Sequence, residues 1–178
     1  AFAGLVIGFL LFGVALQYTG GGQFFLNLAF ALLGHVRGGP AKVAIFASGL
    51  MGSMSGSVIT NVLTTGSMSI PAMKRIGFAP HVAGGVEACA STGGVLMPPI
   101  MGATAFILAI NLEVPYRDVV IAAVIPSILY FFALFMQIDG YAARNNLEGL
   151  PKVELPSLKQ TLKDGWYLSL IHISEPTR

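Results

Sequence analysis

The chain alternates long apolar stretches with short polar ones. Residues 1–34 contain no Lys, Arg, Asp or Glu, and neither do 43–73, 88–112 or 119–138. A helix that spans a bilayer needs about 20 mostly apolar residues. The pattern therefore predicts an all-α integral membrane protein, a polytopic helical bundle, in which residues 1–17 are a truncated transmembrane helix.

Other segments follow from the same pattern. Residues 23–36 follow three glycines and are too short to span a bilayer, which predicts an amphipathic helix in the membrane interface. Residues 118–138 predict a transmembrane helix. Residues 139–168 predict a cytoplasmic loop and the start of another helix, because two prolines argue against one continuous helix. Residues 169–178 break the pattern and resemble a translated sequencing artefact.

The apolar run 43–73 has basic residues at both ends. Arg37 and Lys42 precede it, and Lys74 and Arg75 follow it. Basic loops are usually cytoplasmic, so both ends are expected on the same side of the membrane. A single crossing would separate them. The charges therefore predict a re-entrant helical hairpin over residues 43–73, and one long tilted span is the alternative.

The composition of this run favours the hairpin. Between Ser48 and Ser69, 13 of 22 residues are Ser, Thr or Gly, an unusual composition for a lipid-facing span. Non-helical backbone at membrane depth is tolerated only where it is buried in protein or lines a water-filled cavity. A polar hairpin tip, expected over 53–57, therefore implies a site.

A discontinuous transmembrane helix is predicted over residues 78–112. Its first part is expected from about Pro80 to Thr92, followed by unwound backbone over 93–99 and a second helical part to about Leu112. Two prolines remove backbone donors and clash with the preceding turn, and two glycines just upstream lower the helix propensity further. A simple proline kink is the alternative.

Composition excludes several classes of protein. Hydrophobic residues make up 54% of the 178 residues and charged residues 10%, whereas a soluble domain carries about 25% charged residues. This argues against a soluble enzyme. The net charge of +2 gives no reason to expect a nucleic-acid partner. A single cysteine excludes a disulfide framework.

A polar hairpin beside a broken helix is typical of secondary transporters, in which freed carbonyls and helix ends bind ions and anionic groups. Ser55 and Thr92 lie in these segments and are candidates for the substrate or ion pathway. Glu87 is a further candidate, because an acid inside a membrane segment is a functional hypothesis by default. Pairing with a cation or a polar group inside the bundle is an equally open role for Glu87.

Several motifs carry a family resemblance in their order and spacing. They are Gly34-His35-Val36-Arg37-Gly38-Gly39, Ser55-Gly56-Ser57, Ile70-Pro71-Ala72-Met73-Lys74-Arg75 and Glu87-Ala88-Cys89-Ala90-Ser91-Thr92-Gly93-Gly94-Val95-Leu96-Met97-Pro98-Pro99. Residues 1–168 resemble the large permease subunit of tripartite ATP-independent periplasmic (TRAP) transporters. The last motif is most similar to the type in which small and large subunits are fused, and the chain is expected to be an internal fragment.

The resemblance implies a function. Such permeases import an organic acid with sodium across the bacterial inner membrane, and sodium is the coupling ion, with no other cofactor expected. A periplasmic solute-binding protein and a small permease subunit are the implied partners. The resemblance also implies an elevator-type transport domain and a sodium site that uses the side-chain oxygen of Asn61, the backbone carbonyls of Gly94, Met97 and Pro99, and more weakly Ser57.

Two other functions remain open at this stage. One is another ion-coupled elevator carrier or antiporter that works without a binding protein. The other, more remote, is an intramembrane serine hydrolase that uses Ser55 with His81, although no nucleophile-elbow pattern surrounds Ser55.

Overall fold

The computed structural model describes residues 7, 21–151, 155–158 and 161. The expectations for residues 1–17 and 169–178 lie outside this part, as does most of the segment after residue 151. The six long helices of the described part are α2 (Gly21–Leu33), α3 (Gly39–Ser55), α4 (Val58–Arg75), α5 (Pro80–Gly94), α6 (Ala103–Asn111) and α7 (Tyr116–Arg144). The described residues contain no strand, which agrees with the predicted all-helical class.

Helices α3 and α4 fold back on each other as a helical hairpin. Only Gly56 and Ser57 separate them. Gly56 has a φ of 60°, a left-handed conformation that costs glycine little. The Ser57 hydroxyl then caps α4 by accepting a hydrogen bond from the Thr60 amide at 3.4 Å. The chain thus reverses direction at the small polar cluster.

The hairpin is longer than the expected run 43–73. Helix α3 begins at Gly39, and Lys42 lies inside it, not in a preceding loop. The expectation was wrong because Lys42 has a partner: it is buried and forms an ion pair with Asp139 of α7. A basic residue thus marks a loop only when its charge stays in water.

The broken helix consists of α5 and α6. Residues 95–102 between them are not helical, whereas the sequence predicted unwinding over 93–99. Gly93 and Gly94 remain helical at the end of α5, because their missing side chains are needed for close packing and not for unwinding. Helix α6 has only nine residues and ends at Asn111.

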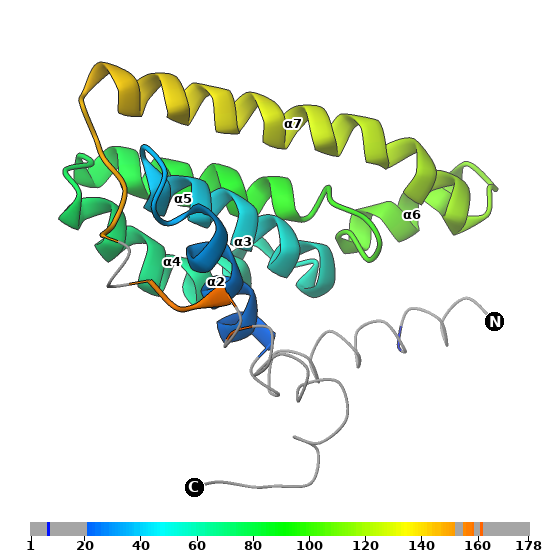
Figure 1. The fold of residues 1–178 in the computed structure, drawn as a ribbon. Coiled ribbons are helices and arrows are strands. Elements are labelled where there is room, and N and C mark those ends of the chain that lie inside the picture. Colours follow the sequence, from blue (N-terminus) through cyan, green and yellow to red (C-terminus); the bar gives the residue numbers. More distant parts are fainter. Residues whose placement is uncertain (1–6, 8–20, 152–154, 159–160, 162–178) are drawn as a thin grey trace, which may run out of the picture.

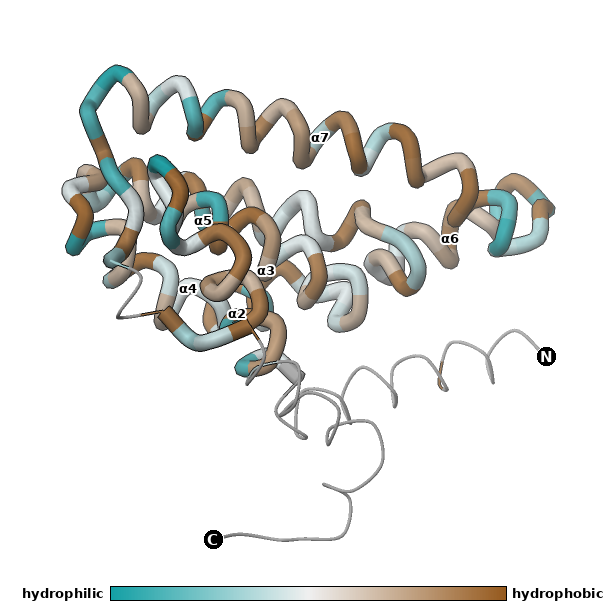
Figure 2. Tube along the Cα trace, in the orientation of Figure 1, coloured by the Kyte–Doolittle hydropathy of each residue, from teal (hydrophilic) through white to brown (hydrophobic). Residues whose placement is uncertain are grey.

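Helix α7 has 29 residues and extends beyond the expected end at residue 138. Asp139 and Arg144 therefore lie in the helix and not in a loop. Within the described residues, α7 is the helix long and apolar enough to cross a membrane, and 11% of its most apolar 18-residue window is buried. Figure 2 shows this apolar stretch along α7, with hydrophilic residues at both ends.

Helix α3 lies at the centre of the packing. It contacts α2, α4, α5 and α7, and Figure 1 shows α7 running along one side of this group. The main core is built around small residues: Ala41, Ala44, Ala83 and Ala90 are all buried. Such residues let helix backbones approach closely, as in membrane bundles. Helix α2 occupies most of the predicted interfacial segment 23–36, and its membrane position stays a prediction.

Candidate ion site between the hairpin and helix α5

One face of α4 is polar and fully buried. Asn61, Thr65 and Ser69 are each 0% exposed. They are four residues apart, so they lie on one side of the helix. This face packs against α3 and α5, and both neighbours supply hydrogen-bond partners. The buried face of the hairpin is therefore a polar seam, defined here as these three residues with Ser48, Glu87 and Ser91.

The amide of Asn61 has a fixed orientation. Its Nδ2 donates a hydrogen bond to the carbonyl oxygen of Ser48 at 2.8 Å, across the hairpin. Its Oδ1 has one contact among the described residues, the Thr65 hydroxyl at 3.5 Å. This is the outer limit for a hydrogen bond. The side-chain oxygen thus remains available to a further partner.

Two glycines bring α5 against this amide. A Cβ atom on Gly94 would lie 2.6 Å from the Ser48 oxygen, 2.8 Å from Cα of Gly52 and 2.9 Å from Nδ2 of Asn61. A Cβ on Gly52 would meet Cα of Gly94 at 2.4 Å. Side chains at either position would separate the helices. The structure thus brings Asn61 and Gly94, two predicted site residues, into direct proximity.

Glu87 is a buried hydrogen-bond centre. It is 0% exposed, and its Oε1 accepts hydrogen bonds from Ser48 at 3.0 Å and Ser91 at 3.3 Å. The hydroxyl of Thr65 also donates to Oε1, and that of Ser69 to Oε2. Donors from α3, α4 and α5 therefore converge on one carboxylate. No Lys or Arg of the described residues forms an ion pair with it.

The hairpin tip is attached to the break in the neighbouring helix. The amide of Ile100 donates to the Ser53 carbonyl at 3.1 Å, and a Cβ on Gly56 would lie 2.4 Å from the Met101 oxygen. Irregular backbone of residues 95–102 thus lies directly against the tip.

The predicted carbonyl ligands differ in their surroundings. The Gly94 carbonyl accepts a hydrogen bond from the Met97 amide at 3.1 Å. The Pro99 carbonyl accepts one from the Tyr116 hydroxyl of α7 at 2.9 Å. The side chain of Met97 lines an apolar cavity of about 320 Å³ between the hairpin and α7. Gly94 directly adjoins the Asn61 amide.

The remaining predicted positions lie at the edge of the seam. Ser57 caps α4, and its backbone amide donates a hydrogen bond to the hydroxyl of Ser55 at 3.4 Å. Thr92 is exposed, and its hydroxyl donates to the Ala88 carbonyl of its own helix at 2.8 Å. The hairpin thus does not engage the Thr92 side chain.

The arrangement argues against a Ser55–His81 dyad. Ser55 ends α3 next to the helix break, whereas His81 lies in the first turn of α5. Helix α5 ends at this same break, and 15 helical residues span about 20 Å. The two side chains are therefore too far apart for proton transfer, which contradicts the hydrolase alternative.

Sequence reasoning missed part of the seam. Ser48, Thr65 and Ser69 were counted only within the Ser/Thr/Gly-rich stretch, and Ser91 was quoted only as part of a family motif. Two spacings in the sequence could have indicated them. Asn61, Thr65 and Ser69 are four residues apart and share one helix face, and Glu87 and Ser91 on α5 have the same spacing. A polar stripe at helical spacing beside a membrane acid indicates a buried network.

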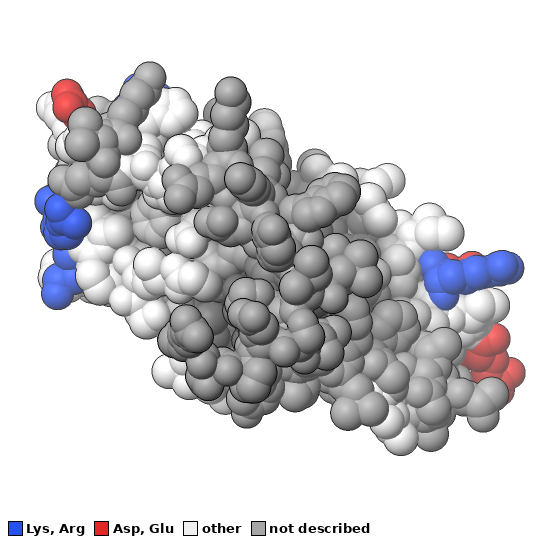
Figure 3. Space-filling view, turned by 60° about the horizontal axis from the view of Figure 1, so that its bottom comes forward, with Lys and Arg blue, Asp and Glu red and all other residues white. Residues whose placement is uncertain are grey.

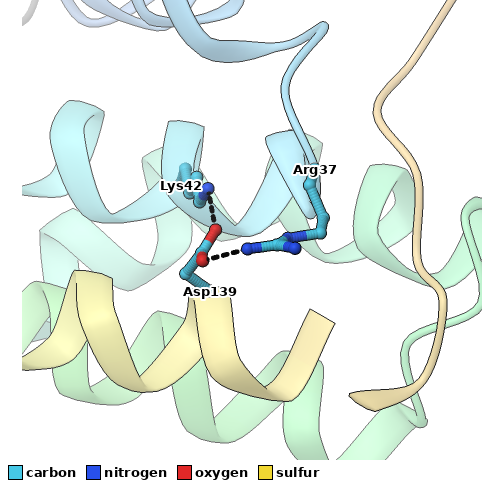
Figure 4. Close-up of polar contacts among 3 residues, drawn as sticks. All are labelled: Arg37, Lys42 and Asp139. Atoms are coloured by element: carbon cyan, nitrogen blue, oxygen red, sulfur yellow. Dashed lines mark hydrogen bonds and ion pairs between the residues drawn. The ribbon is translucent and has the colours of Figure 1, made fainter. Parts of the chain in front are cut away.

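Charged residues are found at both ends of the molecule. Figure 3 shows both Lys or Arg and Asp or Glu side chains at each end, with Lys and Arg more prominent at one of them. The start of α3 is joined to α7 at this end, where Asp139 binds both Arg37 and Lys42 (Figure 4). The ring of Phe135 lies 4.8 Å from Nζ of Lys42. A cation–π contact thus adds to the buried ion pair.

A buried polar hairpin beside a broken helix is the arrangement that secondary transport permeases use around their binding sites. The chain belongs to the family described as tripartite ATP-independent periplasmic transporter, DctM component, which matches residues 1–174. This confirms the predicted family. The family consists of transporter components and not enzymes.

Curated relatives agree with this assignment. The C4-dicarboxylate TRAP transporter large permease protein DctM of Pseudomonas aeruginosa is 33% identical over 95% of this chain and 40% of its own length. The corresponding protein of Vibrio cholerae is 31% identical over 97% of the chain and 39% of its length. The sialic acid TRAP transporter permease protein SiaT of Haemophilus influenzae is 29% identical over 91% of the chain and 26% of its length. The chain thus spans at most about two fifths of these relatives.

Proposed function

We propose that this chain is the hairpin-bearing part of the permease of a sodium-coupled secondary transporter that depends on a solute-binding protein. It would act in the bacterial inner membrane as a multi-pass protein. The family supports the class of transporter. The single observation that carries the ion site is the buried Asn61 amide, whose oxygen faces no close donor.

The chemistry of the site suits sodium. Carboxamide, hydroxyl and carbonyl oxygens are the ligands of hard cations. Asn61 Oδ1 and the backbone oxygens near Gly94 would hold the ion where two helix backbones approach closely. Ser57 and the carbonyls of Met97 and Pro99 belong to the neighbouring tip and break. They would supply the further oxygen ligands of such a site.

The distribution of charge supports a re-entrant placement of the hairpin. Arg37 precedes α3, and Lys74 and Arg75 end α4, whereas the first turn of α7 pairs Arg117 with Asp118. By the positive-inside rule, both outer ends of the hairpin would face the cytoplasm. Its tip would then point into the membrane, toward the ion and substrate.

The implied cargo is an organic acid. Two relatives are named for C4-dicarboxylates and one for sialic acid, and all of these solutes are carboxylates. A periplasmic solute-binding protein would deliver the cargo, and a small permease subunit, separate or fused, would complete the membrane part.

The test uses the full-length permease with its small subunit, reconstituted in liposomes with its cognate binding protein. Uptake of the solute that this binding protein carries is measured against external sodium. Asn61→Ala is expected to raise the sodium concentration for half-maximal uptake about tenfold, as expected for the loss of one ligand worth about 1.4 kcal/mol. Asn111→Ala, at the exposed end of α6, is the matched control.

Two results would contradict the proposal. Sodium activation of Asn61→Ala that equals the wild type would remove Asn61 from the site. Uptake by the wild type that proceeds equally well without the binding protein would instead favour an ion-coupled carrier of the other class.

A further inference from the structure

Glu87 poses an electrostatic problem that hydrogen bonds alone do not solve. A carboxylate removed from water loses several kcal/mol of hydration, which a paired cation normally offsets. Here the described partners are four neutral hydroxyls, of Ser48, Thr65, Ser69 and Ser91. They satisfy both oxygens but supply no positive charge.

One hydroxyl links this carboxylate to the amide of Asn61. Thr65 Oγ1 lies within hydrogen-bond distance of Glu87 Oε1, of the Asn61 carbonyl at 2.8 Å and of Asn61 Oδ1 at 3.5 Å. A threonine hydroxyl has only one proton to donate. The close contacts to Glu87 and to the main chain compete for it, so the distant Oδ1 is left without a donor.

Ser48 makes a second link. Its hydroxyl donates to Glu87 Oε1 at 3.0 Å, and its backbone carbonyl accepts from Asn61 Nδ2 at 2.8 Å. The orientation of the amide is thus fixed through a residue that Glu87 also holds. Both residues that contact the Asn61 side chain through hydrogen bonds are therefore partners of Glu87.

We infer that Glu87 is the positioning and charge-compensating residue of the ion site proposed at Asn61. Through Ser48 and Thr65, it fixes the amide with Oδ1 unoccupied. Its negative charge, one hydroxyl away, is balanced by the cation that Oδ1 accepts. Glu87 itself does not contact the ion, because hydroxyls already surround its oxygens. This role rests on the proposed sodium coupling.

The test measures sodium binding without transport. The full-length permease with its small subunit is purified in detergent, and its melting temperature is followed while sodium chloride replaces potassium chloride at constant ionic strength. A ligand that binds the folded state raises the melting temperature with its concentration. Glu87→Gln keeps the shape of the side chain and removes its charge. We expect the half-saturating sodium concentration to rise at least about tenfold, from the lost attraction between close charges.

A matched control is available for this change. Glu113 is exposed between α6 and α7, so Glu113→Gln removes the same charge outside the seam and is expected to leave the sodium midpoint unchanged. A purely structural role of Glu87 would lower the melting temperature without sodium but leave this midpoint in place. A wild-type midpoint in Glu87→Gln therefore overturns the inference and leaves the proposed function standing.

Thr65 supplies a second test that does not depend on the folding of Glu87→Gln. Thr65→Val removes the linking hydroxyl at almost constant volume and is expected to weaken sodium binding severalfold, whereas Thr65→Ser restores the hydroxyl and most of the affinity. Equal midpoints for the two variants would overturn the inference. A wild type that sodium does not stabilise would overturn the inference and the sodium site together.

Discussion

Helices α4 and α7 place their polar and apolar residues differently. Helix α4 buries Asn61, Thr65 and Ser69 completely, while Ile59 and Leu63 are 74% and 70% exposed. Helix α7 also exposes large apolar side chains, such as Ile125 at 68%. It buries few side chains of any kind, however, and contacts α3, α5 and α6.

The difference shows what holds each helix in place. The contacts of α4 are specific, because Asn61, Thr65 and Ser69 each donate a side-chain hydrogen bond to a neighbouring helix, and losing such a partner would cost about 1–3 kcal/mol. The exposed apolar side chains of α7 have no such constraint. The polar seam therefore fixes geometry, whereas the face of α7 suits lipid or other segments of the permease.

The largest loss of stability is expected where α5 packs most closely against the hairpin. Gly94→Val would place side-chain atoms against the Ser48 carbonyl and the backbone of Gly52. Because backbone cannot move aside as a flexible side chain does, we expect a loss of about 3 kcal/mol or more in stability. Thermal unfolding of the purified full-length permease measures it.

The control for this substitution lies on the same helix. A Cβ on Gly85 meets nothing within 4 Å, so Gly85→Val is expected to change the stability by less than about 1 kcal/mol. Equal losses for the two variants would mean that the contact between the hairpin and α5 is not the tight region of the fold.

An intermediate effect is expected where Asp139 of α7 binds Lys42 of the hairpin. Asp139→Asn would leave Lys42, whose side chain is 6% exposed, without its counter-charge. We expect a loss of about 1–3 kcal/mol in stability, again by thermal unfolding.

Asp118→Asn removes an exposed ion pair at the other end of α7, for comparison with the buried pair at Asp139. Its partner Arg117 is 81% exposed, and ion pairs between exposed groups contribute about 0–1 kcal/mol. A loss at Asp118 as large as that at Asp139 would show that burial of the partner does not set the cost.

The smallest effect is expected on the outer face of α7. Leu129 is 60% exposed, so Leu129→Ala is expected to change the stability by less than about 0.5 kcal/mol. A loss of 2 kcal/mol or more, as for a buried leucine, would show that another segment of the full-length permease covers this face.

The sequence predicted the helical class, the family and the neighbourhood of the site from local signals. Charge-free runs marked the apolar helices, and the Ser/Thr/Gly-rich stretch marked the segment that turns at Gly56 and Ser57. Asn61 and Gly94 were chosen by resemblance, and the structure places them together.

The helix boundaries that the sequence misplaced share a physical cause. The observed boundaries depend on contacts between residues that are distant in the sequence. Lys42 looked like a loop residue because nothing in its local sequence shows that Asp139 lies beside it in space. Gly93 and Gly94 looked like helix breakers, since their role as contact points for α3 and α7 requires the packed helices. Glu87 was noticed as an isolated acid, but its four donors come from three helices.

The hydrogen bonds between Tyr116 and the backbone of the helix break have a consequence for local dynamics. The Tyr116 hydroxyl lies within hydrogen-bond distance of the carbonyls of Pro99 and Ile100, at 2.9 and 2.5 Å, and the Ile100 amide donates to the Ser53 carbonyl. Backbone outside a helix usually opens readily and exchanges its amide hydrogens fast. Here the start of α7 and the hairpin tip hold the same peptide from two sides. The Ile100 amide should therefore exchange as slowly as a helical one, and faster exchange at this amide would report the release of the tip.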